Sequence, residues 1–268
     1  MSEKKVIEKT QAPVSKTDII RDLKALNIQS GDQIMLHVSL SKIGWIIGAE
    51  RALIEALMEV ITEKGTLVMP AQTGNLSDPA LWENPPVPAN WVEKIKANML
   101  PYDPDKSPVY SIGRVAEYFR TYPGVKRSMH PRSAFSGWGH GIEAILNPHE
   151  PGHAFDEKSP LHRMLDQSFK LLMIGTHYDT LTALHYAESQ AYVQKAEKEV
   201  YYVEENGQTN IQTVLEYAYT TDAFNALGKA FEKTDHVQKG YVGYALTRVI
   251  EMSEIIPFAI DYFDAHST

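Results

Sequence analysis

Residues 170–190, KLLMIGTHYDTLTALHYAESQ, predict a buried strand that turns sharply into a helix. The apolar run of residues 170–175 ends in glycine, as short buried strands often do. From Thr180 the chain becomes rich in alanine and leucine, and this composition favours a helix. The chain must therefore reverse within a few residues. We expect the rest of the fold to be organised around this turn.

Four polar residues, Asp179, Thr182, His185 and Glu188, follow one another at intervals of three on this turn and the helix. Residues three apart are neighbours on a helix, so His185 can touch both Thr182 and Glu188. A carboxylate, from Glu188 or Asp179, would fix the tautomer of His185 and suit it to take a proton from an attacking group. A structural interpretation stays open, in which Asp179 caps the helix and His185 and Glu188 form an exposed contact.

The composition is that of a globular protein with a substantial core: 268 residues, 43% apolar and 22% charged. No repeat or linker divides the chain, so residues 1–268 are expected to form a single domain, with residues 1–15 as a loosely held lead-in. The apolar runs are shorter than the about 18 residues of a membrane helix. The start, MSEKKVIEKTQAP, has no apolar secretory core. We therefore expect a cytoplasmic protein without a membrane partner.

The chain contains no cysteine, which excludes a cysteine nucleophile and a thiolate zinc site. The segment HEPGH, residues 149–153, matches the HExxH zinc pattern, but its proline and glycine forbid the helix that this pattern needs. No metal is therefore expected. A formal charge of −8 argues against a nucleic-acid partner and favours a cationic small molecule.

The first third of the chain alternates helices and strands. Residues 17–28 and 48–64 have apolar side chains at helical spacing, whereas residues 33–38 and 65–70 are short apolar runs typical of strands. Strand, helix and strand in this order indicate a βαβ unit. The sheet is therefore expected to be partly parallel, with functional loops at the carboxyl ends of its strands.

The last third predicts a hairpin and two further helices. Asn206 and Gly207 lie between two alternating segments, which is a strong hairpin signal. Helices are expected over about residues 222–233 and 248–264, with short strands between them.

The loop HVSLSKIG, residues 37–44, directly follows the first expected strand. Hydroxyl groups, a lysine and a glycine just before a helix can present donors to an anion, most often a phosphate. Alternatively, Ser39 and Ser41 only form turn hydrogen bonds. The loop matches neither GxxxxGK[ST] nor GxGxxG, so it indicates neither a nucleoside triphosphatase nor a dinucleotide enzyme.

Residues 71–112 are rich in proline, and an irregular stretch of this length is usually a binding loop or a lid. Asp78 and Glu83 in this stretch are candidates for lining the pocket of a cationic acceptor. A surface insertion packed by Trp82 and Trp91 is the structural alternative.

Residues 125–133, VKRSMHPRS, gather cations and hydroxyl groups in one loop of an acidic protein. Arg127 and His130 suit the capture of a phosphate. A charged surface turn is the alternative.

Four stretches together resemble the aminoglycoside 3-N-acetyltransferase family, in consistent order from about residue 17 to the C-terminus. HVSLSKIG resembles its H-x-SL loop, and YDTLTALHYAE resembles its D-x-x-T-x-x-H-x-x-E core. SPVYSIGRVAEYFRTYPGVKRSMHP resembles its TP…G…E-x-FR…PGV-x-RS-x-HP segment, and KGYVGYALTRV its late G-x-V-G-x-A-x-x-R stretch. Four ordered motifs are far more specific than any one of them.

The resemblance implies a three-layer α/β/α fold with a mixed central sheet and a β-hairpin excursion, unlike the common acetyltransferase fold. It also implies acetyl-CoA as donor, the 3-amine of a 2-deoxystreptamine aminoglycoside as acceptor, and antibiotic resistance as consequence. His185 inherits the role of general base, accompanied by Asp179, Glu188 and Thr182. The residues implied in holding CoA are His37, Val38, Ser39, Leu40, Ser41, Gly44, Ser107, Ser111, Arg127 and His130.

The expected reaction is direct transfer, because the chain has no cysteine that could carry the acetyl group. His185 would take the proton of the attacking amine, and the Thr182 hydroxyl or a backbone N–H would stabilise the oxyanion. Val38, Ser107 and Leu181 depart from the family pattern and leave the acceptor open. The alternatives are transfer to a different small amine, a CoA-binding protein without transfer activity, and a serine hydrolase using a residue such as Ser136.

Overall fold

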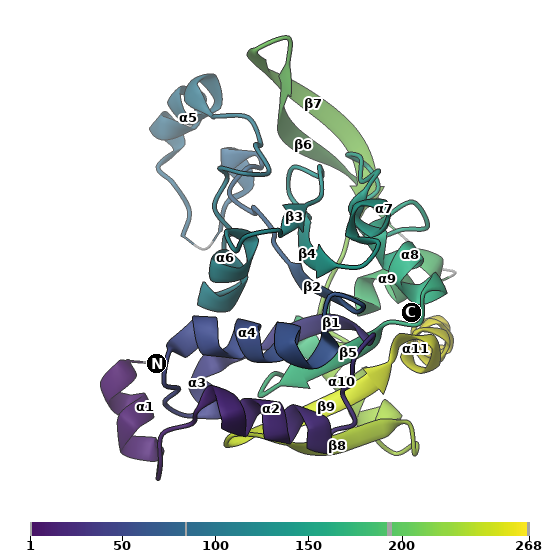
Figure 1. The fold of residues 1–268 in the computed structure, drawn as a ribbon. Helices are drawn as coiled ribbons and strands as arrows, with labels where there is room; N and C mark the ends of the chain where they lie inside the picture. The colour runs from purple at the N-terminus through teal and green to yellow at the C-terminus, as the bar shows by residue number, and fades with distance from the viewer. Residues whose placement is uncertain (1, 84, 192–194, 267–268) are drawn as a thin grey trace.

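The computed structural model describes residues 2–83, 85–191 and 195–266. In this part of the chain, seven strands form one sheet in the order β3-β4-β2-β1-β5-β9-β8 (Figure 1). The central strand β1 runs parallel to β2 and β5, and the other neighbours pair antiparallel. The strands are β1 (Gln33–Val38), β2 (Thr66–Pro70), β3 (Lys126–Arg127), β4 (Phe135–Gly139), β5 (Lys170–Ile174), β8 (Val237–Val242) and β9 (Ala245–Glu251).

Side chains of the central strands alternate between two apolar cores, because successive residues of a strand point to opposite faces. In β1, Leu36 lies in one core and Met35 in the other, and β5 divides Leu172 and Leu171 in the same way. One core is covered by α2 (Lys16–Ala25), α4 (Ala49–Ile61) and α6 (Arg114–Arg120). The other is covered by α7 (Ile142–Leu146), α8 (Pro160–Asp166), α9 (Leu184–Gln190), α10 (Phe224–Phe231) and α11 (Met252–His266).

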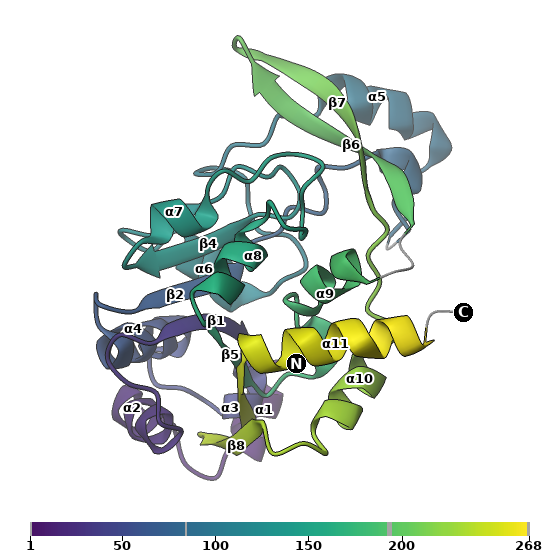
Figure 2. The same cartoon turned by 90° about the vertical axis from the view of Figure 1, so that its right-hand side faces the viewer.

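The two helical layers lie on opposite sides of the sheet, with α2 and α4 on one side and α9, α10 and α11 on the other (Figure 2). The expectation of a three-layer α/β/α fold with a mixed sheet is therefore confirmed. No helix in the described part of the chain combines the length and the apolar character that crossing a membrane requires.

A separate two-stranded sheet forms the expected hairpin, with β6 (Ala196–Glu205) and β7 (Gln208–Tyr217). Asn206 and Gly207 turn between the strands with φ values of 54° and 77°, which these two residue types tolerate best. The hairpin extends beyond the main sheet, with α5 (Val92–Asn98) at the same end of the molecule (Figure 1).

The stretch 71–112 is more regular than its sequence indicates. Besides α5, it contains the short 3₁₀ helices η1 (Pro79–Leu81) and η2 (Ala89–Trp91). The described residues also form three short elements, α1 (Glu3–Lys9), α3 (Leu40–Ile43) and η3 (Tyr178–Thr180).

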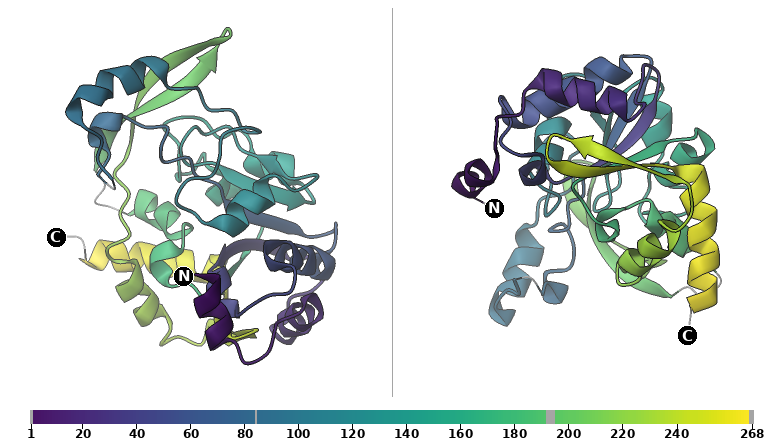
Figure 3. Two further views of the ribbon diagram at one scale, coloured as in Figure 1. Left: turned by 90° about the vertical axis from the view of Figure 1, so that its left-hand side faces the viewer. Right: turned by 90° about the horizontal axis from the view of Figure 1, so that it is seen from below.

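Residues 1–15, expected as a loosely held lead-in, contain a helix and several contacts to the rest of the chain within the described residues 2–15. Residues 3–9 form α1, which lies at the periphery of the molecule (Figure 3). The segment is tied to the loop after α3, because the Trp45 indole donates to Glu3 and the Trp45 N–H donates to the Thr10 hydroxyl. Val14 is buried and forms a parallel bridge with Ile46.

Two helix boundaries also differ from expectation. Residues 248–251 end strand β9 and do not start the last helix, because residues 248–250 pair with both β5 and β8 and Glu251 pairs with β5. The helix expected from residue 180 begins only at Leu184, after η3.

Candidate active site

Strands β1 and β5 are parallel neighbours, so the loops that follow them meet at one edge of the sheet. His37 pairs with Met173 and Val38 with Ile174, and the Ser39 N–H donates to the Ile174 carbonyl at 2.9 Å. The loop at residues 37–44 is thereby attached to the turn that precedes His185.

Two glycines in these loops have neighbours too close for a side chain. Gly175 has φ +68°, and a Cβ there would lie 2.6 Å from the Lys42 Cβ. Gly44 has φ +104°, and a Cβ there would lie 2.7 Å from the Tyr244 ring. A larger residue at Gly175 would push the two loops apart, and one at Gly44 would clash with the Tyr244 ring.

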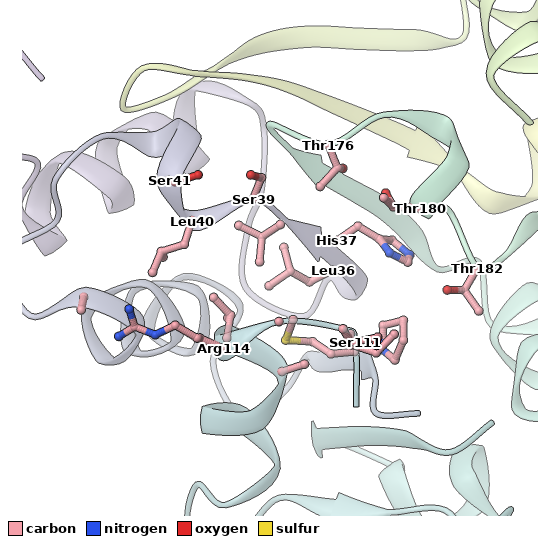
Figure 4. Close-up of a pocket in the computed structure, with 18 of the residues that line it drawn as sticks. Leu36, His37, Ser39, Leu40, Ser41, Ser111, Arg114, Thr176, Thr180 and Thr182 are labelled. Carbon is pink, nitrogen blue, oxygen red and sulfur yellow. The ribbon is translucent and has the colours of Figure 1, made fainter. Parts of the chain in front are cut away.

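A cavity of about 860 Å³ opens at this edge of the sheet (Figure 4). Its wall combines the loop after β1, the turn before α9, residues 111–116 and the N-terminal end of α4. The sequence-predicted residues that line it are His37, Val38, Ser39, Leu40, Ser41, Gly44, Ser111, Asp179, Thr182 and His185. The candidate base and most of the candidate CoA loop therefore share one cavity.

Glu188 is the carboxylate that holds His185, with 2.5 Å between Nδ1 and Oε2. A carboxylate only accepts, so the proton lies on Nδ1 and leaves Nε2 for proton transfer. The other Glu188 oxygen accepts from the Thr220 N–H at 3.2 Å. Asp179, in contrast, is exposed, and its N–H bonds to Asn225.

Thr182 lies two residues before the start of the helix that carries His185. Its carbonyl accepts the His185 N–H at 3.1 Å, so its position relative to the histidine is fixed by the backbone. The residue is buried and lines the cavity.

Three aromatic rings surround the His185 imidazole. Phe155 stacks on it with 5.0 Å between centroids, Tyr219 meets it edge to face at 5.3 Å, and Phe224 lies at 4.9 Å. These residues come from the loop before α8, the end of the hairpin and α10. No motif in the sequence indicated them, because they meet only in the folded chain.

His37 is the second histidine in the cavity wall, and burial changes its pKa. His37 is 6% exposed, and burial lowers its pKa to about 3. Its imidazole is therefore neutral at physiological pH.

Arg127 and His130, predicted to bind a phosphate, do not reach this cavity. The Arg127 guanidinium is buried and donates to the backbone carbonyls of Ser107 and Ala71, and it lies over the Tyr102 ring. It ties the 71–112 stretch to β3. Arg114 instead brings a guanidinium to the cavity, where it pairs with Glu50.

His130 belongs to a buried polar cluster beneath the hairpin. Its Nδ1 accepts the Ser133 N–H at 2.9 Å, and its Nε2 lies 3.4 Å from Glu216. Glu216 also accepts from the Tyr201 hydroxyl and from the Ala154 N–H. The cluster connects the hairpin to the loop that carries Phe155.

Ser107, Asp78 and Glu83 also lie outside the cavity lining. The Ser107 hydroxyl accepts the Asp103 N–H, and Ser107 lines a second, mostly apolar cavity of about 1040 Å³ beside α5. Asp78 caps η1 and pairs with Lys96 at 3.0 Å, and Glu83 is exposed.

Comparison with known proteins finds one family along most of the chain. The family described as "Aminoglycoside 3-N-acetyltransferase" matches residues 35–264. The SPbeta prophage-derived aminoglycoside N(3')-acetyltransferase-like protein YokD of Bacillus subtilis is 37% identical over 97% of this chain and 96% of its own length. The crystal structure of YokD superposes with a TM-score of 0.96, covering 98% of both chains.

Two solved structures of similar proteins contain ligands. AAC-VIa bound to sisomicin is 29% identical, with a TM-score of 0.85 over 96% of this chain and 100% of that chain. AAC-IIIb in a binary complex with CoASH is 25% identical, with a TM-score of 0.84 over 95% of this chain and 97% of that chain.

Proposed function

Because this chain belongs to the aminoglycoside 3-N-acetyltransferase family, a family of acyltransferases, we propose that it moves the acetyl group of acetyl-CoA to the 3-amine of a 2-deoxystreptamine aminoglycoside. The observation that carries this proposal is the His185–Glu188 pair in the wall of the cavity that the loop after β1 also lines. Such a transfer would give its host resistance to the antibiotic.

We propose that acetyl-CoA occupies the cavity of about 860 Å³. The loop of Ser39 and Ser41, the N-terminal end of α4 and Arg114 offer hydroxyl groups, backbone N–H groups and a cation to its phosphates. The thioester would then lie toward His185. The similarity to a CoA-bound enzyme over nearly the whole chain supports this assignment.

The proposed mechanism is a direct attack. His185 Nε2 takes a proton from the acceptor amine while the nitrogen forms a bond to the thioester carbonyl carbon. The carbonyl becomes an oxyanion, which Thr182 or a backbone N–H of the turn stabilises. When the oxyanion collapses, the C–S bond breaks, CoA leaves as a thiolate, and the protonated His185 returns the proton to the sulfur.

Glu188 supports this step by holding His185 in one tautomer and by stabilising the imidazolium that forms. The aromatic rings of Phe155 and Tyr219 keep the imidazole in one orientation. A base that is already oriented loses little entropy when the substrates bind.

A different small amine is the second candidate acceptor, and one observation favours it. An aminoglycoside carries several positive charges, yet Glu3 and Asp179 are the carboxylates among the described residues of the cavity wall. Glu3 is already engaged by Trp45. An acceptor with fewer charges would need fewer carboxylates.

The deciding experiment measures the release of free thiol from acetyl-CoA, with aminoglycosides that carry or lack a free 3-amine. We expect release only with the 3-amine compounds. Release with other amines alone would move the acceptor to the second candidate. If acetyl-CoA does not bind by calorimetry, the proposed function is refuted.

A further inference from the structure

His37 lies on the same face of the sheet as His185. Side chains of β1 alternate, with Leu36 in the core under α2 and α4 and Met35 in the core under α9. His37 has the parity of Met35, so its imidazole emerges on the side of α9. It also lies at the carboxyl end of β1, where the cavity begins.

The His37 imidazole has an unused polar atom at this position. Its Nε2 is buried, and it has no hydrogen-bond partner among the residues that the structure describes. Leaving such an atom unpaired is costly, so a bound water or a ligand atom is expected to pair with it. Thr176 lines the same cavity, and its buried Oγ1 also has no hydrogen-bond partner among the described residues.

The orientation of the ring agrees with a ligand at this place. Figure 4 shows the His37 imidazole turned toward the segment that carries Thr180 and Thr182. His185 follows Thr182 by three residues and lines the same cavity. The His37 ring therefore lies in the wall of the cavity that His185 also lines, on the side of the turn before α9.

We propose that His37 is a further catalytic residue, which donates a hydrogen bond from Nε2 to the carbonyl oxygen of the acetyl thioester. This inference rests on the proposed function. When the amine attacks, the C=O bond becomes C–O⁻, and the His37 N–H stabilises the negative charge without giving up its proton. The charge disappears again when the C–S bond breaks.

A neutral imidazole suits this role better than an imidazolium. Burial keeps His37 uncharged, so one ring nitrogen carries a proton and can donate. Because His37 is neutral, the only imidazole that becomes positively charged in the reaction is His185, which receives the proton of the amine. Two histidines in different surroundings would thus divide proton transfer and oxyanion stabilisation between them.

Infrared spectroscopy tests the hydrogen bond without any acceptor. Acetyl-CoA labelled with ¹³C at the acetyl carbonyl is bound to the wild-type protein and to the variants His37→Phe and His37→Gln. We expect a lowered C=O stretching frequency in the wild type, no lowering in His37→Phe, and partial lowering in His37→Gln, which retains a donor. The surface variant His236→Gln should match the wild type.

A second measurement needs no substitution near the cavity. In wild-type protein labelled with ¹⁵N histidine, acetyl-CoA should move the Nε2 resonance of His37, and CoA, which lacks the acetyl carbonyl, should not. Equal movement by both ligands would overturn the proposal, because His37 would then contact the pantetheine arm. An unchanged carbonyl band in a folded His37→Phe variant would also overturn it.

Kinetics completes the test once an acceptor is known. Losing one oxyanion donor lowers kcat by about 10²–10³-fold, so His37→Phe should show a loss of this size with a nearly unchanged KM for acetyl-CoA. A raised KM with unchanged kcat would mean that His37 only holds the cofactor. Because the spectra require acetyl-CoA alone, failure to find an acceptor would count against the proposed function and not against this contact.

Discussion

At the scale of single residues, the site depends on two imidazoles with different surroundings. His185 is held at Nδ1 by Glu188 and enclosed by three aromatic rings, whereas the His37 Nε2 has no partner in the described chain. The first arrangement fits a base that gains a proton, and the second fits a neutral donor to a ligand.

Substitution of His185 should separate chemistry from cofactor binding. In His185→Ala we expect kcat to fall by about 10²–10⁴-fold, the usual contribution of a general base, while calorimetry gives an almost unchanged Kd for acetyl-CoA. Glu188→Gln should cause a smaller loss, because the base remains but its orientation weakens. His140→Ala is the matched control, since His140 is exposed and is not among the residues that line the cavity. Full transfer activity in His185→Ala would refute the assigned role.

At the scale of elements, α10 packs closely against the turn before α9 because it has a glycine, Gly228, at the contact. A Cβ at Gly228 would lie 2.1 Å from Cγ and Cδ2 of Tyr178, at the end of the ring that is attached to the Tyr178 Cβ. Tyr178 starts η3, and the Arg248 guanidinium lies over its ring at 5.6 Å. The ring therefore has little room to withdraw.

Gly228→Ala should lower the free energy of unfolding by about 1–3 kcal/mol, as overpacking of a core does. Because η3 leads into α9, transfer activity should fall as well. Ala226→Ser in the same helix is the control, since Ala226 is exposed. Urea unfolding measures the difference, and equal stability of the two variants would show that the Tyr178 ring can move.

The hairpin is anchored by Glu216, which accepts hydrogen bonds from the Tyr201 hydroxyl and the Ala154 N–H and lies 3.4 Å from His130 Nε2. Burial raises the pKa of this carboxyl group, but the neighbouring His130 imidazole and the hydrogen bonds from Tyr201 and Ala154 have the larger effect and lower the pKa below its usual value, so Glu216 remains ionised. Glu216 is connected to the surroundings of His185 in two ways. It binds the N–H of Ala154, which precedes Phe155, and it lies four residues before Thr220, whose N–H binds Glu188.

In Glu216→Gln, an amide N–H₂ group would replace one carboxylate oxygen. This group cannot accept a hydrogen bond, so the Tyr201 hydroxyl or the Ala154 N–H would lose its partner. We expect a loss of about 1–3 kcal/mol in the free energy of unfolding. The kcat should fall more than the affinity for acetyl-CoA. Glu205→Gln at the exposed end of the hairpin is the control. If stability is the same in both variants, the cluster does not anchor the hairpin.

At the scale of the whole molecule, buried neutral histidines make stability depend on pH. Burial lowers the pKa of both His37 and His149 in the folded state, whereas in the unfolded chain they titrate near 6.5. Below that pH the unfolded chain binds more protons than the folded protein. The stabilisation is therefore complete above pH 6.5 and is lost as the pH falls toward the folded-state values.

Each of these histidines should lower the free energy of unfolding by about 1.4 kcal/mol per pH unit below pH 6.5. Urea unfolding at pH 7.5, 6.0 and 5.0 measures the slope. His37→Gln should remove the contribution of one histidine, and His236→Gln, an exposed residue, should not. An identical slope in wild type and His37→Gln would mean that His37 is protonated in the folded protein.

The sequence by itself determined the fold class, the family and the spacing of His185 and Glu188. These follow from local periodicity, from Asn206-Gly207 at the hairpin turn and from the interval of three between His185 and Glu188, all of which act over a few residues. Ordered motifs then distinguished this family from other α/β proteins.

The tertiary structure alone decided which of the candidate residues share a cavity. Arg127 and His130 resembled phosphate ligands in the sequence, but folding turned both inward to bind the backbone and a buried carboxylate. The site also includes Phe155, Tyr219 and Arg114, which come from segments far apart in the chain. Long-range packing, which leaves no periodic signal in the sequence, determines where such side chains point.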